Sequence, residues 1–213
     1  MTQLILIRHG ETLWNRERRM QGQRDSPLSD TGLYQARRLG QRLADLSFGV
    51  LYSSDLGRAY ETARSVAEVT GHEIAVDPRL RERHFGVFEG LTSDEIESRF
   101  PAEFDCYKSH NPAYVIPGGE SAQQFHDRCL ACLQEIAERH TGATVVVVTH
   151  GLVLDIAYRA AHAIELGAPR PVPLLNASLN VFDYSNRRWR CETWGDVSHL
   201  QDAAVTHFEG GSV

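Results

Sequence analysis

Three short polar segments of this chain carry side chains that could transfer a phosphoryl group. Each directly follows an apolar run, and they are Arg8-His9-Gly10, Ser53 to Arg58, and His150-Gly151. A phosphomonoester is a dianion, so its transfer needs positive donors around the phosphate oxygens, a nucleophile in line with the leaving oxygen, and an acid that protonates that oxygen. The residues that could fill these roles are Arg8, His9, Arg58, Glu82 and His150.

A neutral imidazole such as that of His9 can attack phosphorus directly, which forms a covalent phosphohistidine and divides one difficult step into two. Its other ring nitrogen must be held by an acceptor, and a backbone carbonyl of the turn at Gly10 is the expected partner. As the acid, Glu82 should have a pKa raised by partial burial and by the approaching phosphate, which predicts an acidic to neutral optimum. The alternative for Glu82 is a surface salt bridge, since Glu89, Glu95 and Glu97 lie nearby.

The apolar periodicity predicts strands that alternate with helices. We expect strands at 4–7, 49–53, 74–76 and 144–149 with a final pair at 178–184 and 188–194, and helices at 31–46, 54–70, 121–140 and 152–161. Asp30 or Thr31 is the expected cap of the helix at 31–46. This order predicts an α/β three-layer sandwich with a mostly parallel central sheet and helices on both faces. Ligands bind beyond the carboxyl ends of such strands, where the three polar segments stand.

Residues 81–120 are irregular, with short helical patches near 92–100 and 103–107 and prolines that interrupt them. We expect this stretch to be a cap or pocket-wall insertion of a single domain that spans residues 1–213. The aromatic residues in or beside it either pack the cap onto the core or line a substrate pocket, and they are Phe104, Tyr107, Tyr114 and Phe125. If they line the pocket, apolar or aromatic phosphomonoesters are favoured.

Composition narrows the class of protein. The net charge of −6 argues against a nucleic-acid binder, because such proteins cluster Lys and Arg against phosphates. No apolar run approaches the roughly 18 residues that a membrane span needs, and no signal-peptide pattern follows Met1, so we expect no membrane partner and a cytoplasmic location. Cys129 and Cys132 lack the second pair that a zinc site needs and are expected in the core, and no histidine cluster has ligand spacing, so no metal or other cofactor is expected.

The segment Leu6 to Asn15 resembles the signature of the histidine phosphatase superfamily, also called the phosphoglycerate mutase-like fold. Further blocks that resemble the family follow in the family's order, at 21–32, 53–63, 80–90, 117–121, 148–151 and 195–200. The resemblance therefore covers residues 4 to about 200 of the 213. A lone Arg-His-Gly would be a weak signal, whereas ordered agreement along nearly the whole chain is specific.

The resemblance implies a role for each matching residue. It makes His9 the phosphorylated nucleophile and Glu82 the proton donor to the leaving group and then the base for water. It also implies that Arg8, Arg58 and His150 bind the phosphate, that Asn15, Gln21 and Gly22 are further substrate contacts, and that no metal is needed.

Within the family, the chain is most similar to the broad-specificity phosphatases. Only 68 positions separate Glu82 from His150 (150 − 82), whereas the mutases usually carry a longer insertion there, so hydrolysis of a small phosphomonoester is expected. The alternatives are a phosphoglycerate mutase and a non-catalytic phosphate-binding module. The sequence leaves open the natural substrate and the choice between a monomer and a homodimer.

Overall fold

The structure is a computed structural model, and it describes residues 1–200 and 207–208. The strands are β1 (Thr2–Arg8), β2 (Val50–Ser53), β3 (Ile74–Val76), β4 (Thr144–Thr149), β5 (Leu174–Leu175), β6 (Leu179–Ser185), β7 (Arg188–Asp196) and β8 (His207–Phe208). The α-helices are α1 (Leu13–Arg16), α2 (Asp30–Ala44), α3 (Gly57–Thr70), α4 (Ser93–Arg99), α5 (Pro101–Lys108), α6 (Ala122–Arg139) and α7 (Gly151–His162). Short 3-10 turns occupy Pro78–Leu80, Gly86–Phe88 and Ser198–Leu200.

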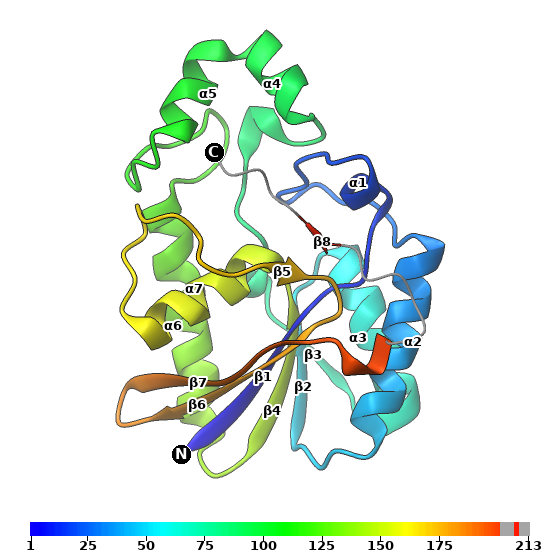
Figure 1. Cartoon of the computed structure of the whole chain (residues 1–213). Coiled ribbons are helices and arrows are strands. Elements are labelled where there is room, and N and C mark those ends of the chain that lie inside the picture. The colour runs from blue at the N-terminus through cyan, green and yellow to red at the C-terminus, as the bar shows by residue number, and fades with distance from the viewer. Residues whose placement is uncertain (201–206, 209–213) are drawn as a thin grey trace.

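Six strands form the central sheet in the order β3-β2-β4-β1-β6-β7 (Figure 1). The pairs β3-β2, β2-β4 and β4-β1 are parallel, whereas β6 is antiparallel to both β1 and β7. The predicted mostly parallel sheet with a final antiparallel pair is therefore confirmed. β5 and β8 pair separately, and this small antiparallel sheet was not predicted.

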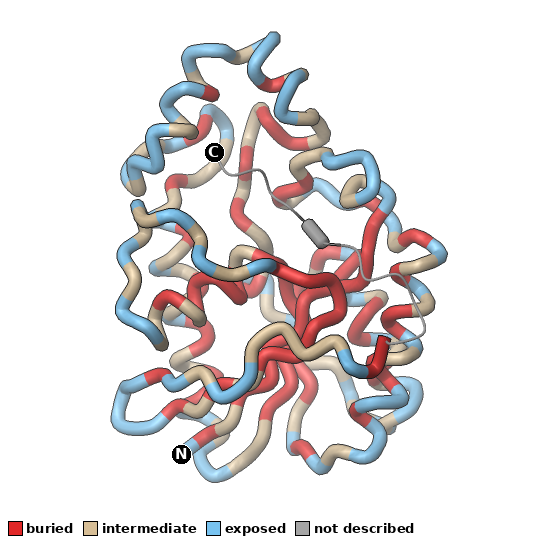
Figure 2. The backbone as a smooth tube through the Cα atoms, viewed as in Figure 1, coloured by how far each residue is buried: buried red, intermediate tan, exposed pale blue. Residues whose placement is uncertain are grey.

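Side chains of β1 and β4 alternate between the two faces of the sheet, as the period of two in a strand requires. Leu4 and Val145 pack in one core with residues of α6 and α7, and Ile5 and Val146 pack in another with residues of α2 and α3. Figure 2 shows this buried centre between half-exposed helices. The helices on both faces confirm the predicted three layers, and the cores confirm that the buried Cys129 and Cys132 of α6 are core residues.

The predicted starts of α2 and α3 differ from the structure. The cap of α2 is Ser29, whose hydroxyl accepts a hydrogen bond from the Gly32 N–H at 3.0 Å, so the expected cap at Asp30 or Thr31 is wrong. Ser29 has an extended backbone, whereas Asp30 is already helical. α3 begins at Gly57 rather than at 54, because the N–H of Ser54 still bonds to the Val148 carbonyl and so extends the sheet.

The segment 81–120 contains α4 and α5, near the expected helical patches. In Figure 1 both helices lie at the top, beyond the carboxyl ends of the parallel strands. The segment has its own apolar cluster, which comprises Phe85, Phe88, Ile96, Phe104 and Ile116. Among the residues that the structure places, no helix is both long and apolar enough to cross a bilayer.

Candidate active site

His9 and His150 meet because β1 and β4 are neighbouring parallel strands that end at the same level. Arg8 is opposite Thr149 in the register, and the His9 N–H donates to the Thr149 carbonyl at 3.0 Å. The next residue of each strand is therefore a histidine, and the two imidazole centroids lie 5.3 Å apart with their planes at 60°. Two chain segments separated by about 140 residues thus place their imidazoles side by side.

The His9 ring is held so that one nitrogen keeps a free electron pair. Its Nδ1 lies 2.8 Å from the Gly10 carbonyl, which confirms the expected acceptor, so we assign the proton to Nδ1. The Nε2 atom then accepts a hydrogen bond from Arg58 Nε at 3.2 Å. Burial, and then the charges of Arg58 and Arg8, hold the pKa of His9 well below its usual value, so the imidazole is neutral at neutral pH.

Arg58 lies in the first turn of α3, fully buried, with hydrogen bonds on every nitrogen. Besides His9, its guanidinium donates to the carbonyls of Gly22 at 2.6 Å and Arg24 at 2.9 Å, and to the Asp25 carboxylate at 3.1 Å. Asp25 also accepts the backbone N–H groups of Gly57 and Arg58, at the start of a helix that has no other side-chain cap. Asp25 therefore fixes both the helix and the guanidinium.

A second carboxylate joins the loop at Gly22 to the segment that carries Glu82. Glu89 is buried and accepts the N–H groups of Gln23, Arg24 and Phe85 at 2.9–3.0 Å. Gly22 has a φ of +57°, and a Cβ there would stand 2.1 Å from Glu89 Oε1. Glycine is therefore required at this position both by backbone conformation and by space.

Glu82 is partly buried and is held by two backbone donors. Its carboxylate accepts the N–H of Arg83 at 2.9 Å and that of Leu152, in the first turn of α7, at 3.1 Å. Burial raises the pKa of Glu82, although these hydrogen bonds and the charges of Arg58 and Arg8 oppose the rise, so the expected direction is confirmed. The surface ion pairs that were the alternative for Glu82 are made by other carboxylates, since Glu95 pairs with Arg19 and Glu97 with Lys108.

The His150 imidazole is also buried and neutral. Burial, and then the charge of Arg58, keeps its pKa well below the usual value. Its Nε2 lies 2.8 Å from Ser54 Oγ, which also accepts the Leu56 N–H at 3.3 Å. Since Ser54 accepts from Leu56, we assign its hydroxyl proton to the bond with Nε2, which leaves the proton of His150 on Nδ1. Across residues 1–200 and 207–208, this Nδ1 has no hydrogen-bond partner.

A cavity of about 250 Å³ lies at these strand ends. Its lining includes seven of the eight sequence-predicted site residues, which are Arg8, His9, Asn15, Gln21, Gly22, Arg58 and Glu82. His150 is the exception, since it is fully buried beside His9 and does not line the cavity. All four aromatic residues singled out from the sequence line the cavity. Phe104 and Phe125 are also buried, so packing against the core and lining of the cavity are both observed.

The remaining predicted residues have defined local partners. Arg8 is buried, its Nη1 donates to the Leu174 carbonyl, and burial lowers its pKa to about 10, which leaves it charged at neutral pH. The Asn15 amide oxygen accepts the Thr12 N–H at 3.1 Å and so caps α1. No group of three or more His, Cys, Asp or Glu side chains with the geometry of a metal site occurs in the part of the chain that the structure describes.

Comparison with known proteins places this geometry in a family. The model of the histidine phosphatase superfamily (branch 1) matches residues 4–197. The chain is 41% identical to two Arabidopsis thaliana proteins, a phosphoglycerate mutase-like protein 4 and a metal-independent phosphoserine phosphatase, over 94% of this chain and 87% and 84% of those proteins. The structure of Bacillus stearothermophilus YhfR is similar, with a TM-score of 0.87 and 40% identity over 93% of this chain and 99% of that one. The chain therefore belongs to the histidine phosphatase superfamily.

Proposed function

We propose that this protein hydrolyses small phosphomonoesters through a covalent phosphohistidine at His9, without a metal. The observation that carries the proposal is the neutral His9 imidazole, whose unprotonated Nε2 shares one cavity with two guanidinium groups and a protonatable carboxylate. The metal-independent phosphoserine phosphatase among the relatives supports both the reaction class and the absence of a metal requirement.

In the first step, His9 Nε2 attacks phosphorus, and the bond from phosphorus to the ester oxygen breaks. Glu82 gives its proton to that oxygen, and the alcohol leaves. In the second step, the Glu82 carboxylate takes a proton from water as the water oxygen attacks phosphorus. The bond from phosphorus to Nε2 then breaks, which releases inorganic phosphate and returns both His9 and Glu82 to their starting states.

The charges around the cavity suit a dianionic substrate. Arg8 and Arg58 carry two positive charges at a buried site, where electrostatic stabilisation of the transferring phosphoryl group is strong. When substrate binds, Arg58 Nε would exchange its hydrogen bond to His9 for a phosphate oxygen and so release the attacking nitrogen. His150 is buried and does not line the cavity, so its Nδ1–H would be a further donor only to a phosphate that reaches past the cavity wall. Asn15, Gln21 and Gly22 border the cavity itself.

We propose that residues 81–120 are a cap within a single domain. They contribute Glu82 and Arg83 to the cavity together with Phe85, Phe104 and Tyr107. Because the cap supplies both the acid and much of the apolar wall, it would hold the organic part of the substrate above the strand ends.

A mutase reaction is the second candidate, because one relative of equal similarity is a phosphoglycerate mutase-like protein. The same phosphohistidine would then pass its phosphoryl group to a second hydroxyl instead of to water. Incubation with 3-phosphoglycerate separates the two: a phosphatase releases inorganic phosphate, whereas a mutase forms 2-phosphoglycerate.

The decisive experiment for the proposed function follows phosphate release from p-nitrophenyl phosphate in EDTA. We expect wild-type turnover, an acid-labile phosphoenzyme after rapid quenching, and loss of both in His9→Ala. His162→Ala, at the exposed end of α7, is the matched control and should keep full activity. Turnover that survives His9→Ala would refute the mechanism.

A further inference from the structure

One arginine that the catalytic proposal does not use also lines the cavity. Arg170 belongs to the segment 163–173, between α7 and β5, and its Nε is buried without a hydrogen-bond partner among the residues described. The Asp155 Oδ1 atom lies 3.8 Å from it, beyond hydrogen-bond distance, and is also without a hydrogen bond. The Arg170 side chain is 28% exposed, but its buried Nε has no hydrogen-bond acceptor, which is costly, and a ligand in the cavity would complete the pair.

Asp155 is already neutralised by another residue. Arg159 donates to Asp155 Oδ2 at 2.8 Å, and both side chains are buried. The other nitrogens of Arg159 donate to the carbonyls of Glu165 and Ala168, which ties the segment 163–173 to α7. The three side chains together carry a net charge of +1, and the excess positive charge is that of Arg170.

The position of Arg170 relative to the phosphate site follows from α7. This helix begins at Gly151, beside Arg8, and the N–H of Leu152 holds Glu82. Asp155 comes four residues after Gly151, which is about 6 Å along the helix axis. Asp155, the partner of Arg170, therefore lies about one helical turn beyond the start of α7. Arg170 is also close enough to Arg8 that its charge contributes to lowering the pKa of Arg8.

We propose that Arg170 determines substrate specificity by binding a carboxylate that the phosphomonoester carries a few bonds from its ester oxygen. This assignment rests on the proposed hydrolysis, and it further specifies that the organic part of the substrate carries a carboxylate. A carboxylate is a monoanion and matches the single excess charge of the cluster, whereas a hydroxyl would leave that charge uncompensated at the cavity wall. A planar guanidinium is also suited to bidentate contact with a carboxylate.

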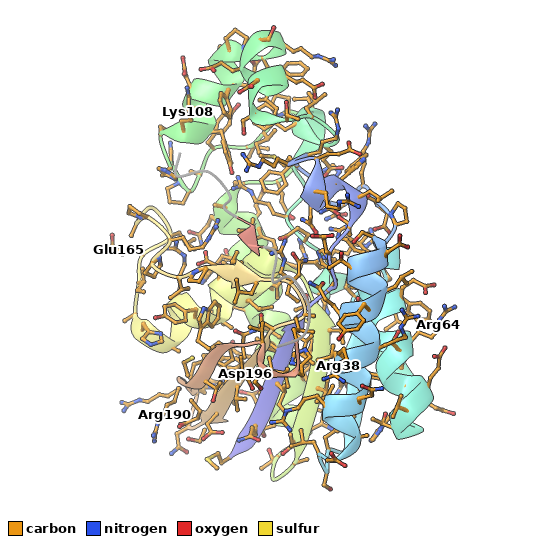
Figure 3. All side chains as sticks on the ribbon, turned by 45° about the vertical axis from the view of Figure 1, so that its right-hand side comes forward. Arg38, Arg64, Lys108, Glu165, Arg190 and Asp196 are labelled. Carbon is orange, nitrogen blue, oxygen red and sulfur yellow. The ribbon has the colours of Figure 1, made fainter. Side chains whose placement is uncertain are left out.

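The test compares two substrates that differ only in this group, 3-phosphoglycerate and glycerol 3-phosphate, with p-nitrophenyl phosphate as a reference that has no carboxylate. Wild type should prefer 3-phosphoglycerate in kcat/KM. Arg170→Met should lower kcat/KM for 3-phosphoglycerate by about 10- to 100-fold, the range for loss of a charged hydrogen bond, and should change the other two substrates less than about twofold. Arg170→Lys should recover part of the loss. Arg190→Met, on the exposed edge strand and pointing away from the molecule (Figure 3), is the matched control.

Two results would overturn the assignment. One is a wild-type enzyme without a preference for the carboxylated substrate. The other is an equal loss on all three substrates in Arg170→Met, which would mark a structural role for the side chain. A wild-type protein that releases no phosphate even from p-nitrophenyl phosphate would instead refute the proposed hydrolysis, so the two failures are distinguishable.

Discussion

Replacement of Asp25 by asparagine tests whether a residue outside the reacting set fixes Arg58 for catalysis. The Asp25 carboxylate is 39% exposed, whereas the Arg58 side chain is 1% exposed. A charged hydrogen bond contributes about 1.5–3 kcal/mol, and the exposure of Asp25 places this one near the lower end. Arg58 keeps its bonds to Gly22, Arg24 and His9, so it stays in the site but is held less firmly. We therefore expect kcat/KM to fall about tenfold.

The assay measures kcat/KM for p-nitrophenyl phosphate together with inhibition by inorganic phosphate. The inhibition reports phosphate binding by the Arg58 guanidinium without any bond cleavage. Both should weaken in Asp25→Asn. Asp25→Ala also removes the cap of α3, worth about 1 kcal/mol, and should lower the melting temperature by about 2–4 °C more. Asp45→Asn, an exposed carboxylate at the end of α2, is the control. Unchanged phosphate inhibition and kcat/KM in Asp25→Asn would refute the reasoning.

Three further changes test the acid, the second imidazole and the glycine. Glu82→Gln should lower kcat by about 10²- to 10⁴-fold for glycerol 3-phosphate, while p-nitrophenyl phosphate, whose leaving group needs no proton, still gives a burst of nitrophenol in stopped flow. In wild type, the acid form of Glu82 disappears as pH rises through a pKa above its usual value, so kcat should fall on the alkaline side; a kcat that rises with pH would contradict this role. Ser54→Ala frees the His150 tautomer and should lower kcat/KM about tenfold with little change in melting temperature, and an unchanged rate would reject our proton assignment. Gly22→Ala places a methyl group against Glu89 and should lower the melting temperature by several degrees, about 2 kcal/mol or more, in a calorimetric scan.

The sequence predicted the strand ends because continuous apolar runs mark buried strands. Leu4–Ile7 and the four valines before Thr149 are such runs, and each stops at an Arg-His or Thr-His pair. Pairing of neighbouring parallel strands then brings those pairs together, and no finer knowledge of the register was needed. Helix bounds were less accurate, since the cap at Ser29 depends on a local φ of −73° and ψ of 170° that several polar residues in that turn could adopt.

The residues that hold the site were not predicted, because their partners are distant in the chain. Asp25 acts on Arg58, 33 residues away, and Glu89 acts on backbone groups up to 66 residues away. Ser54 reaches His150 across 96 residues. Each stands in a segment that resembles the family, which was the available signal, but polar type alone does not show that a side chain is buried. Arg170 lies in a segment without periodicity, so only the coordinates show that it lines the cavity.

In the proposed mechanism, the same two arginines would bind the substrate and also help to keep the nucleophile unprotonated. A buried histidine beside a carboxylate gains a proton and loses its free electron pair, whereas His9 is buried beside two guanidinium groups that oppose protonation. Glu82 responds with the opposite sign, because the positive charges of Arg58 and Arg8 favour its ionised form. In the proposed mechanism, a bound phosphate dianion would offset those charges and so raise the pKa of Glu82 further at the step in which it donates its proton. Substrate binding would therefore prepare the acid, while burial, the largest cause of the lowered pKa of His9, would still oppose its protonation.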